Sequence, residues 1–142
     1  GAATEVEMIE KKHRIDDALE AVRSAQEEGI IVGGGVTLLK IARSLSITLD
    51  SEEQTLGANI VLKACEAPLR TMARNAGESE DLIVEKIVKS KSDECYDFLN
   101  RNLTNAIESG IIDPKKVTRC ALQNAASAAG TLLTTSHAIV KV

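Results

Sequence analysis

The sequence predicts a mainly α-helical protein with a few short β elements. Apolar residues recur at helical spacing along most of the chain, and several segments begin with helix-capping residues. Hydrophobic residues make up 44% of the chain, but Tyr96 and Phe98 are its only aromatic residues. A core built from small aliphatic side chains favours close packing of helices. At 142 residues, the chain is long enough to bury about two-thirds of its unfolded surface.

Composition disfavours several classes of function. The net charge of −4 and the scarcity of aromatic residues argue against nucleic-acid binding, which needs a basic face and stacking platforms. No apolar run approaches the ~18 residues of a membrane span, and no signal peptide opens the sequence. Cys65, Cys95 and Cys120 contain no CxxC pair and fit free thiols in a reducing compartment. His13 and His137 lie at opposite ends of the chain, so no metal site is expected.

The first helix is expected from Thr4, which opens a capping box with Glu7, to about Glu28. Its apolar residues form only a narrow seam, which fits a strut resting on a partner surface better than a core helix. Asp17 lies on the side away from this seam, where a solvated side chain is the ordinary interpretation. The seam residues are Met8, Ile15, Leu19 and Val22.

A short strand, a glycine turn and a second helix are expected next, over 30–32, 33–35 and 36–46. Glycine allows unusual backbone angles and close approach of another group. A helix N-terminus offers unpaired N–H groups that suit a phosphate or carboxylate. The run matches neither GxGxxG nor GxxxxGK[ST], so a simple sharp turn between packed elements remains an alternative.

The middle of the chain is expected to be helical. A capping box at Ser51 opens a helix that runs to Ala67, where Pro68 should break or kink it. Helical spacing then continues to a stop at Gly77, and a short helix follows over 81–89. The 36–46 helix is amphipathic, with the apolar residues Leu38, Leu39, Ile41, Ala42 and Leu45, and the helix before Pro68 carries Leu56, Ile60, Val61 and Ala64 on one face. In the 81–89 helix, Leu82, Ile83 and Ile87 are expected to point inward.

The last third mixes strand and helix signals. The segment 95–99 is expected to be a strand, and 103–109 one or two helical turns that end at Gly110. Asp113 should be the N-cap of the last helix, with Pro114 at its first position. That helix carries a stretch of small residues over 125–130, and the alternating residues 137–142 predict a terminal strand without an obvious partner.

Three blocks resemble group I chaperonins, the GroEL family: Gly1 to Met8, Glu28 to Gly35, and Gly110 to Arg119. They occur in the expected order, and the similarity extends to about Val142. It corresponds to the last quarter or so of such a subunit. The resemblance implies that residues 1–28 belong to the intermediate domain as a protruding helix. Residues 29–142 would then form the C-terminal half of the equatorial ATP-binding domain, which is a helical bundle.

The resemblance also implies roles for individual residues. Asp17 matches the aspartate that activates the water attacking ATP. Gly34, flanked by Gly33 and Gly35, matches the glycine whose backbone contacts the nucleotide. Asp113, with Ile111 nearby, matches the acidic residue that hydrogen-bonds the ribose. The adenine contacts fall on Asp97, Phe98 and Leu99, where bacterial members usually carry Asn-Ala-Ala, so two small residues are replaced by bulky ones.

For the full-length protein, the resemblance implies ATP with Mg²⁺ as cofactor, assembly into a ring, and unfolded client proteins and a co-chaperonin as partners. The location would be the bacterial cytoplasm, or a mitochondrion or plastid in a eukaryote. The apical domain and the phosphate- and magnesium-binding loop are absent from these 142 residues. The chain alone is therefore expected to be inactive, and its exposed apolar faces and terminal strand to promote self-association.

Two alternatives remain at this point. One is a stand-alone helical interaction module that kept the fold and lost the chemistry, which the residues at 98 and 99 and the missing loop favour. The other is an independent nucleotide-binding protein. It is disfavoured, because the sequence contains no phosphate loop with a lysine or metal ligand.

Overall fold

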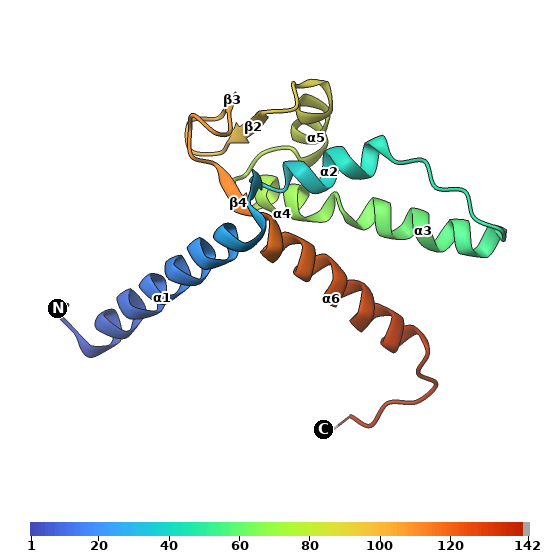
Figure 1. Cartoon of the computed structure of the whole chain (residues 1–142), viewed down its shortest axis with the longest axis horizontal. Helices are drawn as coiled ribbons and strands as arrows, with labels where there is room; N and C mark the ends of the chain where they lie inside the picture. Colours follow the sequence, from blue (N-terminus) through green and yellow to red (C-terminus); the bar gives the residue numbers. More distant parts are fainter. Residues whose placement is uncertain (141–142) are drawn as a thin grey trace. The chain divides into compact units, whose positions relative to one another are not determined.

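The computed structural model describes residues 1–140, and the chain divides into two compact units (Figure 1). One unit combines Gly1–Gly29 with the chain from Pro114 onward, and the other is Ile30–Asp113. Because the first unit also contains the C-terminal helix, the division into an intermediate-domain segment and an equatorial segment stays a prediction. Helices predominate and the strands are short, as the composition predicts.

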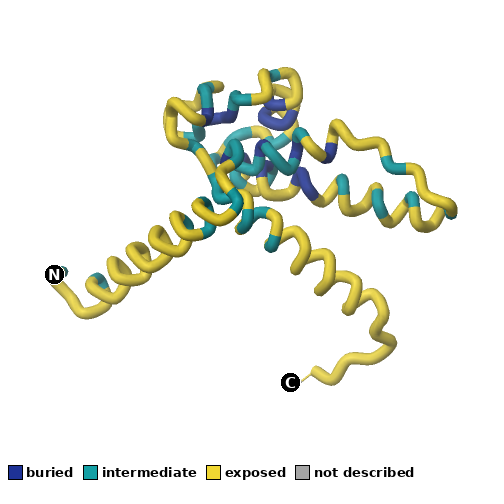
Figure 2. The backbone as a smooth tube through the Cα atoms, in the orientation of Figure 1, coloured by how far each residue is buried: buried dark blue, intermediate teal, exposed yellow. Residues whose placement is uncertain are grey.

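The first unit contains α1 (Glu5–Glu28) and α6 (Lys115–Leu133). The predicted capping box is confirmed: Thr4 Oγ1 accepts a 3.2 Å hydrogen bond from the Glu7 N–H, and the Glu7 carboxylate accepts one from Ala3. No residue of α1 is buried, and Figure 2 shows the helix exposed along most of its length. The narrow apolar seam of α1 is therefore not packed into a core by the described residues of this chain, as predicted.

Polar contacts join the end of α1 to the start of α6. Arg119 donates to both carboxylate oxygens of Glu28, at 2.6 and 3.1 Å, and Lys116 pairs with Glu27. The Gly29 carbonyl accepts a 3.1 Å bond from the Lys115 N–H. The Arg119 guanidinium lowers the pKa of the Glu28 carboxyl. Ion pairs and hydrogen bonds thus hold the end of α1 to the start of α6.

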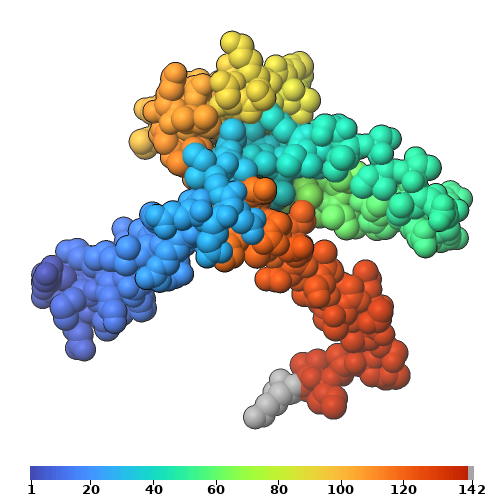
Figure 3. Space-filling view, in the orientation of Figure 1, coloured from blue at the N-terminus to red at the C-terminus, as the bar shows by residue number. Residues whose placement is uncertain are grey.

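The second unit contains the aliphatic core, which α2 (Val36–Ser44), α4 (Ala67–Asn75), α5 (Glu80–Lys89) and β2 (Glu94–Asp97) build. α5 lies against α2, as the adjoining colours in Figure 3 show, and dark blue in Figure 2 marks the buried residues. The residues of this core are Val36, Leu39, Leu69, Ala73, Ile83, Val84, Ile87, Cys95, Tyr96 and Ala106.

Two strand pairs complete the second unit. β1 (Ile30–Val32) pairs with β4 (Ile112–Pro114), and β2 pairs antiparallel with β3 (Asn102–Asn105). In the second pair, Glu94 lies opposite Asn105 and Asp97 opposite Asn102, so residues 98–101 form the turn of a hairpin. The predicted strand 30–32 is confirmed. Of the predicted strand 95–99, residues 95–97 are confirmed as part of β2, whereas Phe98 and Leu99 lie in the turn.

α3 (Glu52–Ala64) begins at the predicted Ser51 cap, and its apolar face is not covered by the rest of the described chain. Leu56 is 57% exposed and Ile60 is 70% exposed, and none of the helix is buried. Helical periodicity identifies an apolar face without identifying what covers it. In α5, the inward prediction is confirmed for Ile83 and Ile87 but wrong for Leu82, which is exposed while Val84 is buried. Ile41 and Leu45, from the apolar face of the predicted 36–46 helix, are exposed as well.

The helix breaks before Pro68 as predicted, but earlier than the expected end at Ala67. α3 ends at Ala64, a short turn follows, and Pro68 lies in the first turn of α4. A proline fits there because the first N–H groups of a helix have no intrahelical partner. Gly77 has a φ of +73° and ends α4 as predicted, and the Glu78 N–H bonds to the Ala73 carbonyl at 2.9 Å.

Three predictions near the C-terminus are wrong. Residues 103–105 form β3 instead of a helical turn, because β2 supplies a pairing edge that local periodicity does not reveal. Asp113 lies in β4, and Pro114 is the N-cap of α6. Residues 137–140 form no strand, and the remainder of that predicted strand, 141–142, lies outside the described residues.

Candidate functional site

In the glycine turn between β1 and α2, close approach of other backbone or a positive φ favours glycine at each of the three positions. The Gly33 N–H donates a 2.9 Å hydrogen bond to the Ile111 carbonyl, and a Cβ at this position would lie 3.0 Å from the same oxygen. Gly34 and Gly35 have φ values of +67° and +73°, which other residues resist. A Cβ on Gly35 would lie 2.9 Å from the Leu69 backbone nitrogen. The turn is therefore held against both β4 and α4.

The turn leads directly into the N-terminus of α2. Gly35 is the N-cap, and within residues 1–140 no side chain caps the first turn of this helix. Thr37 instead donates from its hydroxyl to the Val32 carbonyl at 2.7 Å. Helix N–H groups with partial positive charge thus remain at the glycine turn, an arrangement that suits an anionic group.

Pairing of β1 with β4 brings the two predicted ribose-side residues to the glycine turn. Ile111 is bonded to Gly33, and Asp113 follows two residues later within the paired strand, where it is half-buried. Ile111 itself packs against the core of the second unit. Five of the predicted nucleotide-binding residues therefore lie in one neighbourhood, although they are about 80 positions apart in sequence.

The hairpin turn after β2 carries the three predicted adenine contacts. The Asp97 carboxylate accepts three hydrogen bonds from residues of its own turn. Oδ1 accepts from the Leu99 N–H at 2.8 Å and from the Asn100 N–H at 3.3 Å, and Oδ2 accepts from the Asn100 side chain at 2.7 Å. The Asn100 side-chain amide, followed by the two backbone bonds, lowers the pKa of Asp97. This carboxylate is already largely satisfied by its own turn.

The two bulky residues of this turn point in different directions. Phe98 packs against the core and meets Tyr96 edge to face, with 5.0 Å between ring centroids and 71° between ring planes. Leu99 is 89% exposed. Phe98 therefore contributes to the aliphatic core, and Leu99 presents an apolar side chain at the tip of the hairpin.

Asp17, the predicted catalytic residue, lies in α1 and is exposed. It belongs to the first unit, whereas the glycine turn, Asp113 and the hairpin belong to the second. The structure thus gathers the predicted nucleotide-binding residues around one core. Asp17 lies outside that core.

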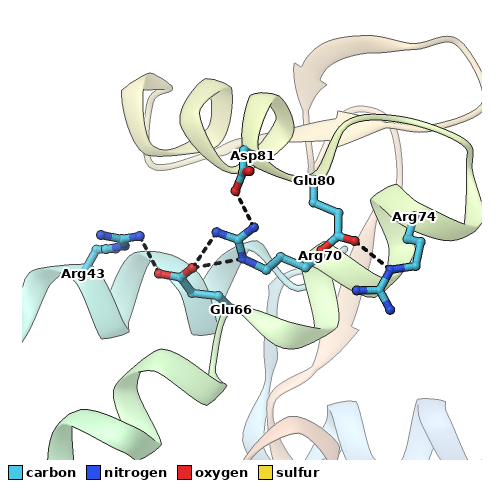
Figure 4. Close-up of polar contacts among 6 residues, drawn as sticks. All are labelled: Arg43, Glu66, Arg70, Arg74, Glu80 and Asp81. Carbon is cyan, nitrogen blue, oxygen red and sulfur yellow. Dashed lines mark hydrogen bonds and ion pairs between the residues drawn. The ribbon is translucent and has the colours of Figure 1, made fainter.

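An ion-pair network ties together the helices behind the glycine turn (Figure 4). Glu66 is only 8% exposed, and it pairs with Arg43 of α2 at 2.5 Å and Arg70 of α4 at 3.1 Å. Arg70 also reaches Asp81 of α5 at 2.7 Å. A buried carboxylate needs such partners because desolvation penalises an unpaired charge. The network therefore fixes α2, α4 and α5 to one another.

Two shallow depressions flank this network, with volumes of about 390 and 300 Å³. Both are lined by Arg43 and Arg70, and neither includes a predicted nucleotide-binding residue. In the part of the chain that the structure describes, no group of three or more His, Cys, Asp or Glu side chains could hold a metal ion. Nor does any helix among residues 1–140 have the length and apolar character to cross a membrane.

Sequence reasoning missed two residues that shape the candidate site. Asn100 binds the Asp97 carboxylate, and Leu69 contacts the glycine turn through its backbone. An Asp followed three positions later by Asn, between two strand-like runs, is a recognisable turn signal and could have indicated the first. The second has no local signal, because it depends on how α4 packs.

The fold is mainly helical, and in it a glycine turn and an acidic strand residue meet beside a small aliphatic core. The chain belongs to the TCP-1/cpn60 chaperonin family, whose model matches residues 1–142. Membership places the chain among the chaperones of protein folding. Members of this family in general use ATP, form rings and bind client proteins.

Proposed function

We propose that this chain forms part of the ATP-hydrolysing machinery of a chaperonin subunit. In this proposal, Gly33–Gly35 and Asp113 form one wall of the nucleotide site, and Asp17 activates the attacking water. The meeting of the glycine turn with Ile111 and Asp113 across the β1–β4 pair carries the proposal. The uncapped N-terminus of α2 at the same turn supports it, because it suits an anionic phosphate.

The proposed mechanism divides the work between the two units. The glycine turn offers backbone N–H groups to the nucleotide, and Asp113 accepts a hydrogen bond from a ribose hydroxyl. Asp17 lies on the exposed side of α1 and would act as a general base toward the water. Positioned general bases typically contribute about 10²–10⁴ in rate.

The remaining parts would come from elsewhere in the intact subunit. The sequence contains no phosphate loop with a lysine or a metal ligand, so Mg²⁺ and the terminal phosphates need residues outside these 142. The chain alone is therefore expected to be inactive. Ring assembly, client proteins, a co-chaperonin, and a bacterial cytoplasmic, mitochondrial or plastid location belong to the same proposal.

Phosphate release from ATP by the intact subunit tests the role of Asp17. We expect Asp17→Ala to lower the rate about 10²–10⁴-fold. Asp16→Ala is the matched control: it removes the neighbouring carboxylate, which points about 100° away around the helix, and should leave the rate nearly unchanged. Equal losses in the two variants, or Mg²⁺-dependent hydrolysis by the 142-residue chain alone, would contradict the proposal.

A stand-alone interaction module remains a second candidate because of the apolar side chains on α1. Met8, Ile15 and Leu19 are each more than half exposed. Such surface suits a protein partner. ATP binding separates the two candidates, because the proposed chaperonin subunit must bind ATP, whereas a stand-alone interaction module does not.

A further inference from the structure

Residues 45–50 connect α2 to α3 as an extended segment (Figure 1), and within residues 1–140 no strand pairs with it. Leu45, at its start, has the backbone angles of a strand, with φ of −90° and ψ of 133°. We propose that this segment pairs, antiparallel and about a two-fold axis, with the same segment of a second copy of this chain. The inference concerns an interaction surface and does not depend on the proposed nucleotide site.

The segment has the alternating pattern of a β-strand. Leu45, Ile47 and Leu49 alternate with Ser46 and Thr48, so in an extended chain the three apolar side chains share one face. Leu45 is 49% exposed and Leu49 is 46% exposed. Edge strands in natural proteins commonly carry charges or prolines that prevent pairing, whereas residues 44–49 contain neither. The segment is therefore open to a partner strand.

The hydrogen bonds of its backbone leave one edge of the segment free. The Leu45 N–H donates to the last turn of α2 at 3.2 Å, and the Leu49 N–H donates to Thr55 Oγ1 at 3.1 Å. In the described part of the chain, no hydrogen bond engages the backbone of Ser46 or Thr48. Alternate residues of a strand direct their N–H and C=O groups to opposite edges. The edge that carries Ser46 and Thr48 is therefore the one available to a partner.

This free edge selects one register. In an antiparallel pair, residues that exchange hydrogen bonds alternate with residues that exchange none. Placing Ser46 opposite Thr48 of the second copy uses both free residues, and the two-fold axis repeats the arrangement. Ile47 then lies opposite Ile47 of the second copy in a non-hydrogen-bonded pair, and Leu45 lies opposite Leu49. Apolar residues thus meet apolar residues across the pair, which stabilises it.

The charges that flank the segment favour the antiparallel direction. Arg43 precedes it with a side chain that is 54% exposed, and Asp50, Glu52 and Glu53 follow it. Among the described residues Arg43 pairs only with Glu66, through Nη2, so its other guanidinium N–H groups remain available. Antiparallel pairing places the basic end of one copy beside the acidic end of the other. Parallel pairing would bring like charges together.

Amide hydrogen exchange in the 142-residue chain tests the pairing. Two-stranded pairing this short is marginal in water, so it should depend on concentration. We expect the amides of Ser46 and Thr48 to exchange at least about threefold more slowly after an about hundredfold increase in concentration, as followed by magnetisation transfer from water. The Ile47 amide points to the other edge and should change less than about twofold. Self-association without this alternation, or no concentration dependence at 46 and 48, would overturn the inference.

Crosslinking tests the register. With Cys120→Ser removing the partly exposed thiol, Ile47→Cys should form a disulfide-linked dimer in a glutathione buffer at least about threefold faster than its matched control, Thr48→Cys. Opposed Cα atoms of a non-hydrogen-bonded pair lie about 4.5 Å apart, within disulfide range, whereas the two copies of residue 48 are staggered along the pair. Exposure alone predicts the opposite order, since Thr48 is exposed and Ile47 is half-buried. Equal rates, or faster crosslinking of Thr48→Cys, would overturn the inference.

Discussion

Among the glycines, Gly35 is the position at which an added Cβ atom would cause the most strain. It combines a φ of +73° with a Cβ site that lies 2.9 Å from the Leu69 backbone nitrogen and 3.0 Å from the Met72 methyl group. The methionine end can move, but the backbone of α4 cannot move without disturbing the core. Backbone angle and crowding thus act together at this residue.

We predict that Gly35→Ala lowers the free energy of unfolding by about 3 kcal/mol, from backbone strain of about 1–2 kcal/mol plus overpacking. Gly110→Ala is the matched control, because Gly110 has a φ of +72° but no atom within 4 Å of its Cβ site. Gly110→Ala should therefore lower the free energy of unfolding only by the backbone strain. Urea unfolding of both variants gives the comparison, and equal losses would show that crowding at Leu69 is relieved.

The three cysteines differ in their accessibility as thiols. All three are free, but Cys65 and Cys95 are buried, whereas Cys120 on α6 is partly exposed. Burial raises the pKa of both Cys65 and Cys95, so less thiolate forms at neutral pH.

We predict that Cys120 reacts first with a thiol reagent such as iodoacetamide at pH 7.5. Cys65 and Cys95 should react at least about tenfold more slowly, because both thiolate formation and access are reduced. Mass spectrometry of digested peptides follows each site, and unfolding in urea, which should equalise the rates, is the control. Faster labelling of Cys95 than of Cys120 in the folded chain would contradict the burial.

At the scale of elements, the joint between α1 and α6 depends on the ionisation of Glu28. Hydrogen bonding by Arg119 lowers the pKa of Glu28 from its ordinary value of 4.5. A lowered pKa in the folded state means that the contact stabilises the joint above pH 4.5. That stabilisation is lost as the pH falls through the lower, folded-state pKa.

We therefore predict that amide hydrogen exchange in the first turn of α6, at 115–119, accelerates as the pH falls below 4.5, beyond the intrinsic pH dependence of exchange. Glu28→Gln should abolish this pH-dependent step, because no carboxylate remains to titrate. The same step in Glu28→Gln would assign it to another group. High salt should weaken the contact in the unsubstituted chain, since both side chains are partly exposed.

Glu66 links α2 and α4 of the second unit and is the buried charge of its network. We predict that Glu66→Ala lowers the free energy of unfolding by about 1–3 kcal/mol, because Arg43 and Arg70 lose their shared partner. Glu85→Ala is the control: it removes an exposed pair with Lys89 and should cost about 0.5 kcal/mol or less. Urea unfolding should separate the two, and equal losses would contradict a structural role for the network.

At the scale of the whole molecule, a large amount of aliphatic surface is exposed. It includes Ile15 and Leu19 on α1, Ile60 on α3, and Leu132 and Leu133 on α6. Soluble monomers rarely expose extensive apolar patches. This surface fits a chain that works in contact with other protein.

We predict that the 142-residue chain self-associates, so that its mass by light scattering rises with concentration above the monomer value of 15.1 kDa. Ile15→Glu should reduce the association by placing a charge in the α1 seam. His13→Glu, which adds the same charge on the opposite side of the helix, should not. A constant monomer mass, or equal effects of the two variants, would remove the seam as an association surface.

The sequence alone determined the features that depend on neighbouring residues. Thr4 and Ser51 begin their helices as predicted, and Gly77 ends one, because capping and left-handed backbone angles are local interactions. The aliphatic character of the core followed from composition. The grouping of Gly33–Gly35 with Asp113 was implied by family resemblance, not by any local pattern.

Only the tertiary structure decided which partners each segment meets. Residues 102–105 became a strand because β2 offers a pairing edge, and Asp113 joined β4 because β1 lies beside it. Phe98 turned inward because Tyr96 and the core accept it, and the apolar face of α3 stayed exposed because nothing in this chain's described residues covers it. These outcomes depend on contacts between residues distant in sequence, whose energies local periodicity and propensity do not contain.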